Sequence, residues 1–143
     1  YGDHRDVHSF PARRSSDRQV NGLTLKDQLS ALSEAVEDAL TLEIDPEIIK
    51  SIAEAGVIHF AGRNDGVAEE LTLKTNEITR KKSDYLEGTY AVHGIEEVME
   101  ADDVVIIINP FEDELEKFRE TLVEGVGTKV IVISDREIGR AHV

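Results

Sequence analysis

Three side chains between Gly62 and Gly94 carry groups that could move protons. Lys74 and Glu77 are three positions apart in a segment of helical periodicity, so both project from one face of a helix. His93 follows them and precedes Gly94, whose missing side chain allows a backbone or a ligand to approach closely. A carboxylate, an amine and an imidazole are groups that perform general acid–base catalysis. We therefore treat Lys74, Glu77 and His93 as candidate catalytic residues.

Simpler interpretations of the same residues stay open. A lysine and a glutamate at this spacing commonly form a solvated ion pair, here extended by Glu70, that stabilises a helix by a few tenths of a kcal/mol. His93 by itself fits a partly buried histidine at the start of a helix, bonded to a backbone carbonyl. His59 lies inside an apolar run, and we assign it a packing role. Spacing alone does not establish a site.

The two ends of the chain differ in character from the rest. Residues 8–17 and 137–143 resemble translations of the two common sequencing-adapter oligonucleotides. We therefore expect residues 1–18 and 136–143 to be adapter-derived and exclude them from the interpretation of the fold. The alternative is a basic arm or targeting peptide around Arg13, which no neighbouring apolar segment supports. One domain then occupies residues 19–135.

The composition excludes several classes of function. The chain has 30 acidic against 16 basic residues and a net charge of −14, which would repel a nucleic-acid backbone. The one cationic run, residues 80–82, suits the carboxyl end of a helix. Cysteine is absent, which fits a cytoplasmic protein, and no apolar stretch is long enough to cross a bilayer. We expect no nucleic-acid or membrane partner.

Metal and nucleotide cofactors are not expected either. Once the ends are excluded, His59 and His93 are the only histidines left, too few for a histidine-based metal centre. The glycines near residue 62 lack the spacing of a dinucleotide fingerprint, and no P-loop lysine follows them. We therefore expect no cofactor.

The elements that must position these residues follow from hydrophobic periodicity and capping signals. Apolar residues recur every three or four positions from 25 to 40, and a second helix begins at Asp45-Pro46 and ends at Gly56. Runs rich in valine and isoleucine without alternation are typical of strands buried on both faces of a parallel sheet. The pattern predicts strands at 57–61, 104–108 and 130–133 with a weaker one at 84–87, and helices at 67–79, within 94–100 and at 111–124.

Alternating strands and helices imply right-handed crossovers and a three-layer α/β/α sandwich with a parallel sheet. The turn from Gly62 to Gly66 directly follows the first of these strands. Doubly wound proteins place small ligands at such turns. We therefore expect a ligand near Gly62.

The run from Val57 to Asp135 resembles a SIS (sugar isomerase) domain. It resembles most the second of the paired SIS modules in the isomerase half of glucosamine-6-phosphate synthase-like proteins, and the two preceding helices fit the segment before that module. The motifs that carry the resemblance are Gly62-Arg63, Leu73-Lys74-Thr75-Asn76-Glu77-Ile78, His93-Gly94 and Asp103-Val104-Val105-Ile106, followed by a helix that begins at a proline.

The resemblance implies roles for individual residues. Glu77 would be the general base that moves a proton between adjacent carbons of a sugar, and Lys74 would assist it. His93 would act in ring opening across a dimer interface, so the parent protein would be a homodimer. Gly62, Arg63 and Gly94 would bind the substrate, a phosphorylated hexose or hexosamine.

The chain also departs from the family pattern. The family histidine is usually followed by Gly-Pro, whereas Gly94-Ile95 follows here. The serine- and threonine-rich phosphate loop of the first module has no counterpart, and the family's final strand, helix and tail would come after Asp135. We therefore expect a truncated module that is catalytically inactive by itself. The alternatives are a non-catalytic phosphosugar-sensing module of a regulatory protein and an acidic α/β domain with a vestigial site.

Overall fold

The computed structural model describes residues 19–20, 23–63 and 66–134. The chain divides into two compact units, Tyr1–Glu43 and Ile44–Val143. The segments that we assign to adapter sequence lie outside the described residues. No helix in the described ranges combines the length and the apolar character that crossing a membrane requires.

The first unit contains the predicted amphipathic helix. Strands β1 (Gln19–Val20) and β2 (Leu23–Thr24) pair antiparallel, and helix α1 (Leu25–Thr41) follows at once. Leu29, Leu32 and Val36 recur at the spacing of one helix face, which confirms the periodicity prediction.

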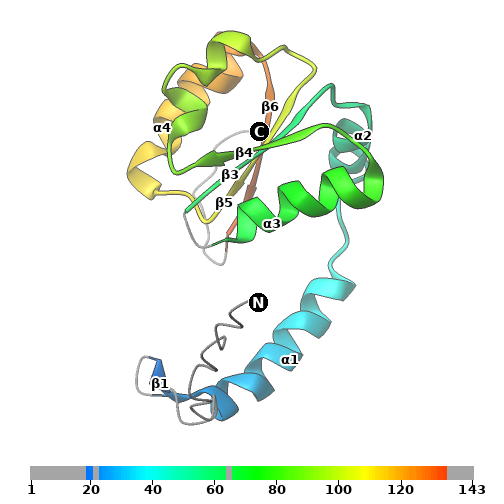
Figure 1. The fold of residues 1–143 in the computed structure, drawn as a ribbon, viewed down its shortest axis with the longest axis vertical. Coiled ribbons are helices and arrows are strands. Elements are labelled where there is room, and N and C mark those ends of the chain that lie inside the picture. The colour runs from blue at the N-terminus through cyan, green and yellow to red at the C-terminus, as the bar shows by residue number, and fades with distance from the viewer. Residues whose placement is uncertain (1–18, 21–22, 64–65, 135–143) are drawn as a thin grey trace, which may run out of the picture. The chain divides into compact units, whose positions relative to one another are not determined.

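The second unit is built on a four-stranded sheet (Figure 1). Its strands are β3 (Ile58–Gly62), β4 (Ser83–Glu87), β5 (Val104–Ile108) and β6 (Lys129–Ile133). All neighbours pair in parallel in the order β4-β3-β5-β6, so the central strands are β3 and β5. Every residue of both central strands is buried, as the continuous apolar runs predicted.

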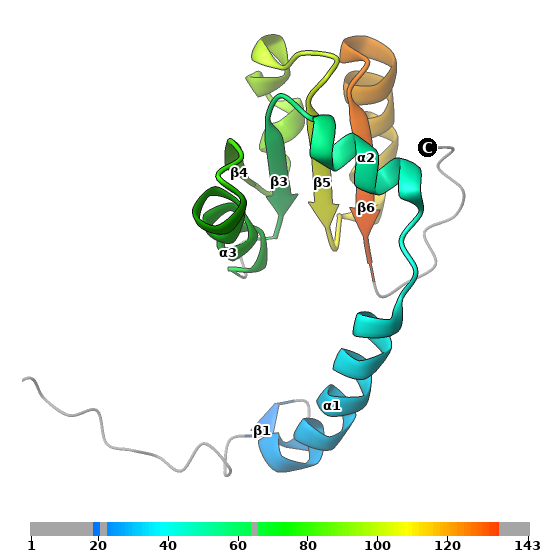
Figure 2. The same cartoon turned by 90° about the vertical axis from the view of Figure 1, so that its right-hand side faces the viewer.

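Helices cover both faces of the sheet and complete the three-layer α/β/α fold (Figure 2). In β5, Val104, Ile106 and Ile108 pack on the face that carries α2 (Pro46–Glu54) and α3 (Val67–Lys74). Val105 and Ile107 pack on the face that carries α4 (Leu115–Phe118). Because successive strand residues point to opposite faces, one apolar run supplies both cores. The predicted fold class is confirmed.

Helix α2 starts where its capping signal placed it, whereas the helix predicted from residue 111 begins with a 3-10 turn. Two helices change their winding along their length. Asp45 accepts a hydrogen bond from the Glu47 N–H at 2.8 Å and caps α2 (Pro46–Glu54). Helix α3 (Val67–Lys74) continues as a π-helical segment, and so does α4 (Leu115–Phe118). The π-helical segments are Thr75–Thr79 and Arg119–Val126, and short 3-10 turns occupy Tyr90–Val92, Ile95–Val98 and Glu112–Glu114.

A buried polar cluster closes the amino end of the sheet. The Asp103 carboxylate accepts hydrogen bonds from the backbone N–H groups of Val57 at 2.8 Å and Glu100 at 2.9 Å. His59 Nε2 lies 3.6 Å from Asp103 Oδ2, and both side chains are buried. A Cβ at Gly56 would come within 3.0 Å of Asp103 Oδ1, so this position accommodates only glycine without displacement.

Candidate functional site

The strand order creates one place where a ligand crevice is expected. From β3 the chain crosses over to β4 on one side, and it then returns to place β5 and β6 on the other side. The switch in direction lies between β3 and β5, which end at Gly62 and Ile108. Ligands of open α/β sheets bind outside the carboxyl ends of the strands at such a switch point.

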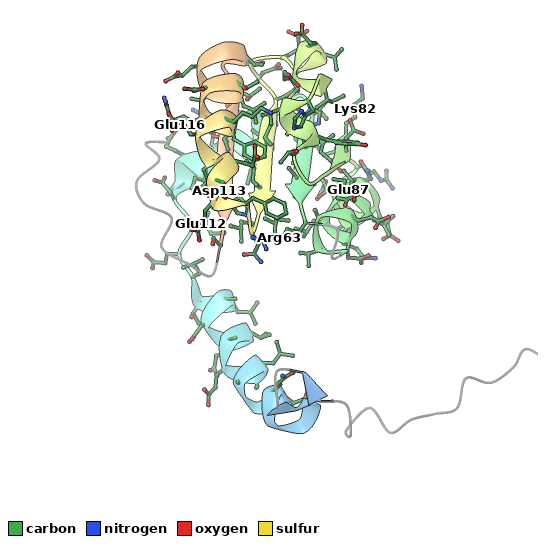
Figure 3. The ribbon with its side chains drawn as sticks, turned by 90° about the vertical axis from the view of Figure 1, so that its left-hand side faces the viewer. Arg63, Lys82, Glu87, Glu112, Asp113 and Glu116 are labelled. Atoms are coloured by element: carbon green, nitrogen blue, oxygen red, sulfur yellow. The ribbon has the colours of Figure 1, made fainter. Side chains whose placement is uncertain are left out.

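Arg63 spans this switch point. Its Nε donates a hydrogen bond to the Asn109 carbonyl at 2.8 Å and its Nη2 donates one to the Pro110 carbonyl at 3.1 Å, so it joins the ends of β3 and β5 (Figure 3). The guanidinium also lies 4.5 Å from the ring centroid of Phe111, in a cation–π contact.

Arg63 keeps unused hydrogen-bonding capacity. A guanidinium has five N–H donors, and the bonds to Asn109 and Pro110 use two of them. Among the described residues Arg63 forms no ion pair with a carboxylate, although acidic residues dominate the chain. The side chain is exposed, so a positive charge faces solvent at the switch point.

The two glycines predicted to contact substrate have structural reasons to be glycine. A Cβ at Gly62 would lie 3.1 Å from the Ala68 Cβ, so its small size lets the end of β3 approach α3. Gly94 has a φ of +111°, a conformation that favours glycine, and apart from its chain neighbours no described protein atom lies within 4 Å of where a Cβ would be. Asn64 and Asp65, between Arg63 and Gly66, lie outside the described residues.

Lys74 and Glu77 meet as the spacing predicted. Lys74 Nζ lies 2.9 Å from Glu77 Oε2 and 3.7 Å from Glu70 Oε1. The Lys74 side chain is 48% exposed and the Glu77 side chain is 60% exposed. The contact is thus a solvated ion pair extended by Glu70. Glu77 lies inside the π-helical segment, a feature that the sequence did not indicate and that is frequent at functional sites.

The Lys74–Glu77 ion pair lies at the end of α3 that is farther from the switch point. The Asn76 side chain exchanges two hydrogen bonds with the backbone of Ser83, the first residue of β4, at 2.9 and 3.1 Å. This places Glu77 near the amino end of the sheet. Lys74 is eight residues beyond Gly66, or about 12 Å at 1.5 Å per residue. Arg63 therefore lies before the amino end of α3, and Glu77 lies beyond its carboxyl end.

His93 lies on the other face of the sheet. The preceding residues Ala91 and Val92 are buried in the core that also contains α4, and the His93 ring contacts Lys117 of α4, with Nε2 3.3 Å from Nζ. Helix α3, which leads to Glu77, packs on the opposite core. One chain therefore does not bring His93 to Lys74 and Glu77.

Sequence reasoning missed three parts of this arrangement. It did not connect Asn109 or Phe111 with Arg63, although Asn109-Pro110 follows a predicted strand and marks a turn at its carboxyl end. It also did not indicate that Lys117 contacts His93.

Within the described ranges, no group of three or more histidine and acidic residues is arranged to hold a metal ion.

An apolar cavity of about 280 Å³ lies between α4 and its π-helical continuation on one side and β6 on the other. Its walls include Ile107, Phe118, Val123, Val130 and Val132. None of the predicted site residues lines it. The cavity therefore does not support the predicted chemistry.

Comparison with known proteins yields a fold and no family. No protein-family model and no curated protein matches the sequence. A protein from Bacteroides fragilis NCTC 9343, assigned as a phosphosugar isomerase involved in capsule formation, superposes with a TM-score of 0.54 at 18% identity, over 79% of this chain and 67% of its own. A protein from Salmonella typhimurium LT2, assigned as sugar-binding, superposes with a TM-score of 0.51 at 19% identity, over 63% of this chain and 29% of its own.

Glucosamine-6-phosphate deaminase from Thermotoga maritima is 23% identical over 59% of this chain and 27% of its own, with a TM-score of 0.47 that is too loose to support an argument. The chain spans less than a third of the length of the sugar-binding protein and the deaminase. At these identities the likeness extends to the fold. The chain is thus similar in fold to solved sugar-binding and phosphosugar isomerase structures.

Proposed function

We propose that this chain is a phosphosugar-binding SIS module of a sugar-phosphate isomerase or aminotransferase-type enzyme. The observation that carries the proposal is the 2.9 Å contact between Lys74 and Glu77, within a π-helical turn of a fold shared with a protein assigned as a phosphosugar isomerase. The motif around this pair is the one that resembles the family's proton-transfer residues. The ligand is a phosphorylated hexose or hexosamine.

Arg63 is the residue best suited to hold the anionic part of such a ligand. It is exposed at the switch point, its position is fixed by Asn109 and Pro110, and further N–H donors remain for phosphate oxygens. A guanidinium matches the geometry of phosphate better than a lysine does. Hydrogen bonds to charged groups typically contribute about 1.5–3 kcal/mol, so this contact would matter for affinity.

Proton transfer would be the role of Glu77. As a base it would remove a proton from one sugar carbon and return it to the neighbouring carbon, while the Lys74 ammonium would stabilise the developing oxyanion. His93 would come from a second copy of the chain, because in one chain it lies on the opposite face of the sheet. Catalysis would therefore require a homodimer, and we expect the isolated monomer to be inactive.

A second candidate is a non-catalytic module that senses a phosphosugar in a regulatory protein. The separation of Arg63, Glu77 and His93 within the chain favours it, because binding needs the switch point but no proton shuttle. The retained lysine, glutamate and histidine favour the enzyme. An adjoining amidotransferase domain or second SIS module in the gene would indicate the enzyme, and a helix-turn-helix domain would indicate the regulator.

Ligand binding is tested by titrating the ¹⁵N-labelled chain with fructose 6-phosphate and glucosamine 6-phosphate. We expect amide shifts around Arg63 and Asn109, and at least a tenfold weaker affinity for Arg63→Met, because a tenfold change corresponds to about 1.4 kcal/mol. Arg80→Met is the matched control, since Arg80 is exposed at the end of the π-helical segment. The unphosphorylated sugars should not bind. Equal affinity of the two arginine variants would contradict the proposed binding role.

Catalysis is tested separately by turnover of the same two sugar phosphates. The isolated chain should give none, and measurable turnover would refute that expectation. In the complete dimeric enzyme, Glu77→Gln should abolish turnover and leave sugar binding largely intact, whereas Glu70→Gln, which changes the other carboxylate beside Lys74, should retain turnover. Unchanged activity of Glu77→Gln would exclude it as the base and leave the sensor.

A further inference from the structure

We propose that Lys117 is a positioning residue that selects the Nδ1-protonated tautomer of the neutral His93 ring. The inference deepens the proposed function, because it rests on His93 as a residue of the site. It starts from the contact between Lys117 Nζ and His93 Nε2, 3.3 Å apart.

Both ends of this contact are anchored in the core. His93 follows Ala91 and Val92, which are buried, and its backbone N–H donates to the Tyr90 carbonyl at 3.1 Å. Lys117 is half-buried on α4 and precedes Phe118, which is 3% exposed. The two side chains therefore project from backbone that packing holds in place, and only their outer atoms are free to rotate.

The chemistry of the two groups decides which of them donates. A lysine ammonium has three donors and no acceptor, and a neutral imidazole has one donor and one acceptor. In a hydrogen bond with this ammonium, Nε2 must therefore supply the lone pair. The ring hydrogen then sits on Nδ1, because the partner of one ring nitrogen determines which nitrogen is protonated.

Lys117 has acidic alternatives and does not use them. Asp113 and Glu114 precede it by four and three positions, the spacings at which helical ion pairs form. In the described part of the chain, the ion pairs do not include Lys117. The acidic residue nearest to His93 on its own turn, Glu96, accepts a hydrogen bond from the Gly94 N–H.

This arrangement determines what His93 can offer to a ligand. The Nε2 lone pair is occupied by Lys117, so the group left for a sugar oxygen is the Nδ1–H donor. His93 would therefore act as a hydrogen-bond donor toward the ligand and not as a base, and the base would remain Glu77. Lys117 acts through His93 and needs no contact with the sugar.

The experiment is a measurement of the His93 ring nitrogens by long-range ¹H–¹⁵N NMR in the full chain, at a pH where the ring is neutral. His93→Gln assigns the signals, since the chain has five histidines. We expect one dominant Nδ1–H tautomer in the unmodified chain. Lys117→Met should bring the shifts toward those of two exchanging tautomers, and Lys117→Arg, which keeps a donor, should restore the single form.

Lys129→Met is the matched control, because Lys129 contacts Ser51 and not His93. It should leave the ring shifts unchanged. A dominant Nε2–H tautomer in the unmodified chain, or ring shifts that Lys117→Met does not alter, would overturn the inference. The measurement requires no ligand, so a failure to bind any phosphosugar would contradict the proposed function without changing this result.

Discussion

Two pairs in this molecule each place a carboxylate beside a nitrogen base, in opposite surroundings. His59 and Asp103 are 7% and 6% exposed, at the amino end of the sheet. Lys74 and Glu77 are 48% and 60% exposed, on one helix. A carboxylate in the core is stable only if its oxygens are bonded, and Asp103 accepts two backbone N–H groups. The exposed pair is solvated and, in the described residues, both its side chains face water.

The comparison shows that closeness of a carboxylate and a nitrogen base does not define a role. The buried pair belongs to the fold, because Asp103 bonds the backbone just before β3 and just before β5. The exposed pair adds little to the fold, because water screens it. Substitutions should therefore separate the two pairs by the size of their effect on stability.

Asp103→Ala should have the largest effect. It removes the acceptor of two part-buried hydrogen bonds, those of the Val57 and Glu100 backbone N–H groups, and leaving such a group without an acceptor typically costs about 1–3 kcal/mol. We expect the free energy of unfolding, measured in urea, to fall by about 3–5 kcal/mol. The neighbouring exposed Asp102→Ala should change it by less than about 0.5 kcal/mol. Equal losses for both would remove the distinction between buried and exposed acids.

His59→Leu should stabilise the protein by about 1 kcal/mol. Both ring nitrogens of His59 are buried without a hydrogen-bond partner, and an apolar side chain of similar size removes that penalty. Asp103 keeps its two backbone bonds in the variant. Urea unfolding measures the change. A loss of more than about 2 kcal/mol would instead mean that His59 and Asp103 form a charged pair that the fold requires.

Breaking the exposed Lys74–Glu77 pair should hardly change the free energy of unfolding. Lys74→Met and Glu77→Gln should each lower the free energy of unfolding by about 0.3–0.5 kcal/mol, and the double variant should lose little more. A double-mutant cycle by urea unfolding gives the coupling, which salt should weaken further because both groups face solvent. A coupling above about 1 kcal/mol would place this pair in the same class as the buried one.

The smallest effect concerns a third pair, Glu116 and Arg119. The hydrogen bond from Arg119 lowers the pKa of Glu116 below its ordinary value of 4.5. A lowered folded-state pKa means a stability contribution that is present above the unfolded-state pKa and is lost as the pH falls through the folded-state pKa. Carboxyl NMR titration should give Glu116 a lower midpoint than it has in Arg119→Met. Equal midpoints would show that the exposed contact has no effect on titration.

Much of the fold could be predicted from local pattern. The apolar runs of β3 and β5 predicted buried parallel strands because strands covered on both faces need apolar residues at every position. The same pattern predicted a buried strand at 130–133, but β6 lies at the edge of the sheet and only Val130 in it is buried. Asp45-Pro46 predicted the start of α2, because an aspartate at the N-cap accepts a hydrogen bond from a free N–H group of the first turn and a proline at the first position has no N–H group that needs an acceptor. No sequence pattern predicted the π-helical segment that contains Glu77.

The candidate site was only partly predictable. Lys74 and Glu77 are neighbours on one helix, so their contact follows from spacing. Arg63 was expected near a ligand, but its bonds to Asn109 and Pro110 join two loops that only the strand order makes adjacent. The positions of Arg63, Glu77 and His93 relative to one another likewise depend on helix length and on which face of the sheet each crossover covers.

The sequence by itself determined the elements and the contact between Lys74 and Glu77, because these depend on interactions between residues a few positions apart. It also indicated the parallel three-layer fold, through the alternation of strands and helices. The tertiary structure decided that His59 meets Asp103, that Arg63 bridges the ends of β3 and β5, and that Lys117 meets His93. It also decided that Glu77 and His93 lie on opposite faces. These contacts join residues distant in the sequence, and only the packing of helices on a shared sheet brings such residues together or holds them apart.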